Sequence, residues 1–479
     1  MTPAPPEANR ATLRYLTLGL LCSVQMMLNL DDTIVNVALP TIQRHLHMSE
    51  TDLTWIINAY LLLFGGFLLV GGRSADLFGG KHVFLIGVTV FGLSSLATGL
   101  AQNSAILIAS RAGQGIGGAF ASPAALSIVA TLFTDPRERS RALGIWAGLG
   151  GLAATLGVVL SGVMTEYAGW RWCFLINVPV AVLALVLAHR LLPDRRAART
   201  GIRLDGLSAA LITSAIAALD LGLIDSGHSS GLATAARIAL GLTLLAAFLL
   251  RAGRSRVPMI PLSFFRDRDR AVANTANILF CSAILSMLFF LTLHLQQVLH
   301  FTPLRTGLAW LPFCALVIAG FATAAALVPN LGVRPILVAA MASGAVGMLL
   351  LSRVPATAHY PALLPGMLTA GFGMGLGFVS ITIAAVGETH ADITGLASGF
   401  VTTTQQLGGA LGLGVLSTIA LHHRSTQLAA GASPEQALTQ GFQLTYLISA
   451  VILTLTALLT AVGITATTGA TRPDPLPVS

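Results

Sequence analysis

Charged residues are scarce in this chain. Asp, Glu, Lys and Arg together make up 10% of the 479 residues, whereas a water-soluble globular protein carries about 25%. Hydrophobic residues account for 54%. Because so few polar side chains cannot cover a water-facing surface of this size, the composition excludes an ordinary soluble protein and indicates one embedded in a lipid bilayer.

Lysine is almost absent, and Lys81 is the single one. The phosphate-binding pattern Gly-x-x-x-x-Gly-Lys-Ser/Thr does not occur, so ATP-driven work and nucleotide binding within this chain are not expected. The net charge of +8 comes from arginines in short segments between apolar runs. These arginines form no basic stripe with interleaved aromatic residues, which argues against binding to nucleic acid.

Cysteine is also rare, and the spacing of the four cysteines does not match a disulfide framework or a metal site. Cys22, Cys173, Cys281 and Cys314 lie in or beside apolar runs and show neither disulfide nor metal-site spacing. No arrangement of a nucleophile with a general base is visible either. The sequence therefore predicts no enzyme, no bound metal and no cofactor.

Long apolar runs dominate what is present. A membrane-spanning helix needs about 20 apolar residues, and fourteen runs qualify, so we expect an all-α protein with fourteen spans and both termini on one side. The runs are 15–38, 53–72, 82–101, 105–133, 140–163, 173–191, 205–224, 234–251, 271–298, 305–328, 334–353, 360–386, 394–421 and 441–464. The first run is expected to be a retained span, because no small-residue cleavage site follows it.

The arginines predict the orientation. With the N-terminus inside, 20 of the 27 Lys and Arg residues fall in inner segments and six in outer ones. Basic residues accumulate on the cytoplasmic side of membrane proteins. Both termini are therefore expected to be cytoplasmic.

Two basic connections divide the chain. The polar stretches 189–205 and 251–270 bracket two spans, with six spans before them and six after. Glycines occur at alternate positions in 113–118, and a similar glycine spacing recurs in 371–377, which indicates a weak internal repeat. We therefore predict a six-span half (1–192), a two-span insertion (193–270) and a second half (271–479), a design used by transporters.

The most specific string is Leu30-Asp31-Asp32-Thr33-Ile34-Val35-Asn36-Val37-Ala38-Leu39-Pro40. It resembles the end of the first span in the fourteen-span drug:proton antiporter family of the major facilitator superfamily. Asp31 takes the signature position and Asp32 the variable one, and Pro40 is expected to close the run. A carboxylate inside a membrane is costly and is usually functional, although the pair could simply end a helix near water. The resemblance implies that Asp31 carries a proton.

A second string, Gly72 to Lys81, resembles the superfamily's cytoplasmic loop between spans two and three. Gly72, Asp76, Gly79 and Lys81 match, whereas Leu77 and Gly80 replace arginines. The resemblance implies a conformational latch in which Asp76 faces a helix N-terminus, where negative charge is favoured. An ordinary basic turn is the alternative.

Arg111 opens a third string, Arg111-Ala112-Gly113-Gln114-Gly115-Ile116-Gly117-Gly118, which is similar to the fourth-span signature. The resemblance implies that this arginine couples protonation to opening, and an arginine in an apolar helix needs a partner or water. Asp31 is the expected partner, with Asp32 as a possible third coupling residue. The glycines also match a dinucleotide fingerprint, but no strand precedes them.

The fifth span departs from the family. Gly157-Val158 and Ser161-Gly162 stand where antiporters carry Gly-Pro and Gly-Gly, which weakens the link to export. The resemblance resumes afterwards. The matching strings are Gly169 to Phe174, Asn177-Val178-Pro179, Gln296-Gln297-Val298, Pro303 to Leu308, and the glycine-rich run from Gly395 to Gly412.

Other polar residues inside the spans are candidates for lining a cavity, and each could instead make a helix–helix hydrogen bond. They are Gln25, Asn29, Asn58, Gln114, Asn274, Asn277, His294, Gln405 and Gln406. Asp220, Asp225 and Glu388 are weaker candidates for a second protonation site.

Together these features predict an exporter of a drug-like or antibiotic small molecule that exchanges it for protons. Its partners would be the substrate, protons and the lipids of a bacterial cytoplasmic membrane. An importer or a metabolite exporter on the same fold is one alternative, supported by the missing fifth-span proline. A membrane sensor that does not transport is another.

Overall fold

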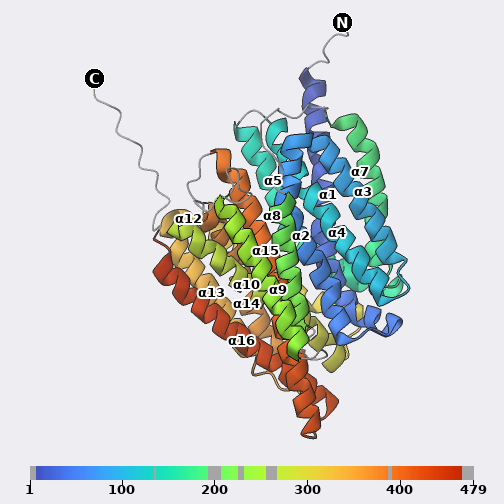
Figure 1. Cartoon of the computed structure of the whole chain (residues 1–479), viewed down its shortest axis with the longest axis vertical. Coiled ribbons are helices and arrows are strands. Elements are labelled where there is room, and N and C mark those ends of the chain that lie inside the picture. The colour runs from blue at the N-terminus through green and yellow to red at the C-terminus, as the bar shows by residue number, and fades with distance from the viewer. Residues whose placement is uncertain are drawn as a thin grey trace.

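The computed structural model describes residues 7–133, 136–192, 206–224, 231–254, 267–386 and 391–465. Helices make up the regular structure of these ranges, and none of them contains a strand (Figure 1). The elements are α1 (Glu7–Leu46), α2 (Glu50–Phe78), α3 (Gly80–Gly99), α4 (Ser104–Leu132), α5 (Pro136–Tyr167), α6 (Trp172–Leu175), α7 (Asn177–Leu191), α8 (Gly206–Ile224), α9 (Gly231–Arg254), α10 (Arg268–Leu293), the π-helix η3 (His294–Val298), α11 (Pro303–Ala309), α12 (Leu311–Leu331), α13 (Val333–Leu351), α14 (Tyr360–Val386), α15 (Ala391–Ala429) and α16 (Pro434–Gly463).

Each of the fourteen predicted runs falls on a helix. Three runs are each divided between two elements: α6 and α7, α10 and η3, and α11 and α12. Ten helical segments of the described ranges are long and apolar enough to cross a membrane. The protein is therefore a multi-pass membrane protein, and the number of fourteen crossings remains a prediction.

Pro40 closes the first apolar run but does not end the helix. Helix α1 continues through Pro40 to Leu46. A proline inside a helix removes one backbone hydrogen bond and clashes with the preceding turn. In a membrane, however, the helix is the conformation that satisfies the remaining backbone groups, so it persists across the proline.

Two sets of helices show dense internal packing, and they also contact each other directly through α2 on α15 and α5 on α11. In the first group, α2 and α3 pack on α4, and α1 packs on α5 and α7; in the second group, α10 packs on α15 and α16, and α14 packs on α12 and α13. We call them the first group (α1–α7) and the second group (α10–α16 with η3). Helix α8 contacts both α2 and α15, one from each group, and α9 packs on α8 (Figure 1).

Glycines bring α4 unusually close to its neighbours. A Cβ atom at Gly115 would lie 2.6 Å from the carbonyl oxygen of Tyr60 on α2, and one at Gly117 would lie 2.4 Å from the backbone nitrogen of Phe91 on α3. Such close packing through small residues is typical of membrane helices. The fourth-span glycines thus pack helices together around the turn that carries Arg111.

Candidate functional site

Asp31 and Arg111 form an ion pair in the interior of the first group. The Arg111 Nη1 atom lies 2.5 Å from the Asp31 Oδ2 atom, and both side chains are 0% exposed. The Arg111 Nε atom donates to the carbonyl oxygen of Ile56 at 3.1 Å, and the guanidinium carbon lies 4.5 Å from the ring centroid of Tyr60. The structure therefore brings together Asp31 of the Leu30–Pro40 string and Arg111 of the Arg111–Gly118 string.

Amide side chains complete the shell around Asp31. The Asp31 Oδ1 atom accepts hydrogen bonds from Gln114 Nε2 at 2.9 Å and from Asn177 Nδ2 at 2.7 Å. Gln114 also donates to the Ser95 hydroxyl at 2.7 Å. Arg111 and Gln114 share one face of α4 because they are three residues apart. Helices α1, α4 and α7 thus meet at one carboxylate, and α3 holds Gln114 in place through Ser95.

This network explains how two charges are held in an apolar interior. Removing an ion from water costs several kcal/mol, which a buried pair offsets only with good geometry and further hydrogen bonds. Asp31 has three donors, but the Arg111 Nη2 atom has no hydrogen-bond partner among the described residues. The arginine is therefore less completely satisfied than the carboxylate. Neutralising Asp31 with a proton would remove the charge that holds Arg111 in place.

Asp32 lies in a different environment. Its side chain is half-buried and takes part in no hydrogen bond or ion pair with the part of the chain that the structure describes. Gln25, Asn29 and Asn36 are half-buried on the same helix at spacings of three and four residues. The interior face of α1 thus carries the paired Asp31, and a more accessible polar face carries Asp32.

The predicted cavity-lining residues separate into two sets. Gln25, Asn29 and Gln405 are half-buried, and Gln25 bonds to Asn29 at 3.0 Å. The remaining members are buried. They are Asn58, Gln114, Asn274, Asn277, His294 and Gln406.

Most of the buried amides connect helices. Asn58 of α2 donates to the carbonyl oxygen of Ala410 on α15 at 3.1 Å. Asn277 of α10 donates to the Val401 carbonyl oxygen at 2.8 Å and to the Thr404 hydroxyl. A buried amide in an apolar helix is stabilised by such bonds. In this conformation Asn58 and Asn277 make the helix–helix hydrogen bonds that were the alternative, and a role in lining a substrate cavity stays a prediction.

The predicted loop after the second run is mostly helix. Helix α2 continues to Phe78, and α3 begins at Gly80, so Gly79 alone separates them. Gly72 is half-buried within α2, and Lys81 donates from Nζ to the His189 carbonyl oxygen at 3.4 Å. The side chain of Asp76 lies outside what the structure describes, so its role as a latch stays a prediction.

Gly79 is held in a conformation that other residues rarely adopt, with φ 90° and ψ 133°. We expect Gly79→Ala to lower the free energy of unfolding by about 1–3 kcal/mol, because a Cβ atom is strained at such angles. Thermal unfolding of the purified protein measures this effect. Gly206→Ala is the matched control, since a Cβ atom there meets nothing within 4 Å. Equal melting temperatures for the two variants would contradict the prediction.

The unusual fifth-span string packs against the first helix. A Cβ atom at Gly157 would lie 2.0 Å from the Thr33 hydroxyl oxygen. The Ser161 hydroxyl donates to the carbonyl oxygen of Ile34. Helix α5 is therefore fixed directly to the turn of α1 that follows Asp31 and Asp32, without the proline of the family pattern.

Asn177, Ser95 and Tyr60 contribute to the site, but sequence reasoning did not single them out. Asn177 stood in a recognised string, Asn177-Val178-Pro179, which was the one available signal. The side chain of Asp220 and all of Asp225 and Glu388 lie outside the described residues. A second protonation site at those positions therefore remains a prediction.

Comparison with known proteins identifies the family. The sequence profile of the Major Facilitator Superfamily matches residues 21–413. The puromycin resistance protein pur8 of Streptomyces alboniger is 36% identical over 93% of this chain and 90% of its own length. The cephamycin export protein CmcT of Amycolatopsis lactamdurans is 35% identical over 84% of each chain.

Solved structures share the fold at low sequence identity. An auto-inhibited peptide transporter of the POT family superimposes with a TM-score of 0.68 over 92% of this chain and 96% of its own, at 15% identity. Because the profile covers most of the sequence and both relatives align over more than four fifths of their length, this chain belongs to the Major Facilitator Superfamily of transporters.

Proposed function

We propose that this protein exports an antibiotic-like small molecule across the bacterial cytoplasmic membrane in exchange for protons. Two relatives at 35–36% identity are named for antibiotic resistance or export, which supports the substrate class. The ion pair between Asp31 and Arg111 carries the proton part of the proposal. A fully buried carboxylate opposite an arginine is a typical element of proton pathways in membranes.

The proposed cycle uses the pair as a two-state element. When Asp31 is ionised, it holds Arg111 through the 2.5 Å contact. When a proton neutralises Asp31, the arginine loses its counter-charge and is free to turn towards the half-buried Asp32 or a bound substrate. Asp31 and Arg111 lie where α1, α2 and α4 meet. Breaking and re-forming their ion pair therefore changes how the first group packs on the second, and so the side of the membrane to which the site opens.

Alternating access then links the two fluxes. Substrate binds while the site faces the cytoplasm, and the two groups rock against each other. Protons from outside favour release of substrate, and they leave on the inner side during the return. In this scheme Asp31 is the main proton carrier, Arg111 the coupling residue and Asp76 the latch.

Everted membrane vesicles test the proposal. Vesicles from a pump-deficient host that expresses the protein should accumulate a fluorescent antibiotic-like substrate when respiration acidifies their lumen. A protonophore should release the accumulated compound. Accumulation that persists with the protonophore, or none with any compound of a broad antibiotic panel, would contradict the proposal.

A further inference from the structure

The string from Gln296 to Ala309 has no role in the proposed cycle. It occupies η3, the following turn and α11. These elements lie at the end of the bundle where α1 ends at Leu46 and α2 begins at Glu50, which we call the α1–α2 end. At this end the string contacts helices of the first group. The following inference rests on the proposed function and assigns the string a part in it.

Gln296 makes the central contact. Its Nε2 atom donates to the carbonyl oxygen of Val37 on α1 at 2.7 Å, which joins the second group to the first. Val37 lies three residues before Pro40 in α1, and its carbonyl oxygen is the main-chain acceptor that α1 offers to the second group. Gln296 itself lies in a π-helix, a form that frequently marks functional sites.

Further contacts between the groups surround this bond. Gln297 Nε2 lies 3.3 Å from Gln43 Oε1, and the backbone N–H of Leu304 donates to Glu166 Oε2 at 3.3 Å. A Cβ atom at Gly162 on α5 would lie 2.7 Å from the Pro303 carbonyl oxygen. Backbone thus packs directly on backbone here, and no water layer separates α5 from α11.

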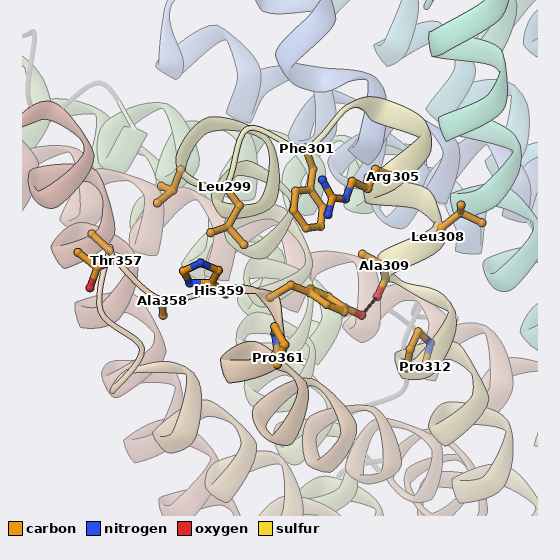
Figure 2. A pocket seen from close by; sticks show the side chains of 13 residues that line it. Leu299, Phe301, Arg305, Leu308, Ala309, Pro312, Thr357, Ala358, His359 and Pro361 are labelled. Atoms are coloured by element: carbon orange, nitrogen blue, oxygen red, sulfur yellow. Dashed lines mark hydrogen bonds between the residues drawn. The ribbon is translucent and has the colours of Figure 1, made fainter.

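The string is fixed to the second group. The Tyr360 hydroxyl on α14 donates to the Ala309 carbonyl oxygen at 2.7 Å, the bond drawn in Figure 2. The guanidinium carbon of Arg305 lies 4.3 Å from the centroid of the Phe301 ring, and both border the surface pocket of about 860 Å³ in Figure 2. Because η3 packs on α10 and α16 of the second group, the bond from Gln296 to α1 must break when the groups separate at this end.

A polar cleft of about 610 Å³ lies beside these contacts. Its lining includes Arg44 and Glu166 from the first group and Gln296, Gln297 and His300 from the second. Val37 follows Asp31 by six residues, about 9 Å along α1. The Gln296–Val37 bond therefore lies between a water-accessible cleft and the helix turn that carries both aspartates.

We propose that the Gln296–Val37 hydrogen bond seals α1 against the second group at the α1–α2 end, the predicted outer side, where Arg424 of α15 also pairs with Glu50 of α2. Gln296 is a positioning residue in this account. It holds α1 against the second group while the site is closed to the outside. Because α1 carries both Asp31 and the Val37 acceptor, a shift of α1 when Asp31 takes up or loses a proton changes the strength of the seal.

Spin labels on the α1–α2 end test this seal. His45→Cys on α1 and Thr357→Cys in the second group are exposed positions, whereas the four native cysteines are buried. Pulsed electron paramagnetic resonance on the full chain in nanodiscs should show mainly the short, closed distance. Gln296→Leu should raise the ratio of open to closed molecules about five- to tenfold, the effect expected from loss of one hydrogen bond.

Gln443→Leu is the matched control. Gln443 also donates from Nε2 to a main-chain carbonyl, that of Val354 at 2.8 Å, but both residues belong to the second group. This variant should leave the distance distribution unchanged. Identical distributions for Gln296→Leu and Gln443→Leu would overturn the proposal. The distances are measured without substrate or a proton gradient, so failure of the seal is distinguished from failure of the export proposal.

A reversible cross-link provides a second test that does not depend on folding of Gln296→Leu. Gln43→Cys with Gln297→Cys should be joined by a bis-methanethiosulfonate reagent whose spacer makes up for the shortened side chains, because the tips of the two wild-type amides lie 3.3 Å apart. The cross-linked protein should stop transporting and recover when the cross-link is reduced. Full transport by the cross-linked protein would show that this end does not have to open.

Discussion

Arg111→Ala is expected to lower the free energy of unfolding by about 3–5 kcal/mol and to abolish export. Removing one partner of a buried ion pair leaves the other charge without compensation, which accounts for an effect of this size. Asp31 would keep its bonds from Gln114 and Asn177 but lose its counter-charge. The change would also remove the contact of the guanidinium with the Tyr60 ring. Thermal or denaturant unfolding of purified protein measures the loss of stability.

Arg353→Ala is a suitable control, because Arg353 is exposed at the end of α13. A surface substitution of this kind usually changes stability by less than about 0.5 kcal/mol. The double variant Asp31→Asn with Arg111→Gln should recover part of the stability, since it removes both charges together, but it should not recover export. If Arg111→Ala were as stable as Arg353→Ala, the ion pair would not hold the first group together.

Asp31→Asn is expected to reduce proton-driven efflux to the level of vesicles that lack the protein. Asparagine has nearly the shape of aspartate, so substrate binding in the absence of a gradient should persist. It neither ionises nor attracts Arg111, so the two-state exchange described above is lost. Accumulation in everted vesicles and equilibrium binding of the same fluorescent compound separate these two effects.

Asp32→Asn provides the comparison within the same helix. Because Asp32 is half-buried and takes part in no ion pair among the described residues, its substitution should weaken proton-driven efflux without abolishing it, since Arg111 can still turn towards a bound substrate. Loss of efflux in Asp32→Asn together with normal efflux in Asp31→Asn would make Asp32 the proton carrier.

The pairing of Asp31 with Arg111 could be predicted because the interior of a membrane protein offers few other charged partners. A carboxylate and an arginine in apolar helices each need an opposite charge, and few charges are available. The shell around the pair could not be predicted in the same way. Asn177 and Ser95 come from α7 and α3, and a single amide or hydroxyl in an apolar helix is compatible with many partners.

Helix positions were largely predictable from the apolar runs, whereas helix ends were not. Pro40 and the residues from Gly72 to Phe78 look like helix breakers or a loop by local preference, yet α1 and α2 continue through them. Near a bilayer, main-chain groups that leave the helix lose their hydrogen bonds at high cost, which overrides local preference. The one residue between α2 and α3 is Gly79, where positive φ favours glycine.

Proton movement coupled to substrate is the most direct test of the central claim. The test uses proteoliposomes that enclose a pH-sensitive dye and contain the wild-type protein. When an imposed gradient drives substrate across the membrane, the dye should report protons moving in the opposite direction. Proteoliposomes with Asp31→Asn should show no substrate-dependent proton movement. If Asp31→Asn moved as many protons per substrate as the wild type, the carboxylate paired with Arg111 would not be the coupling site.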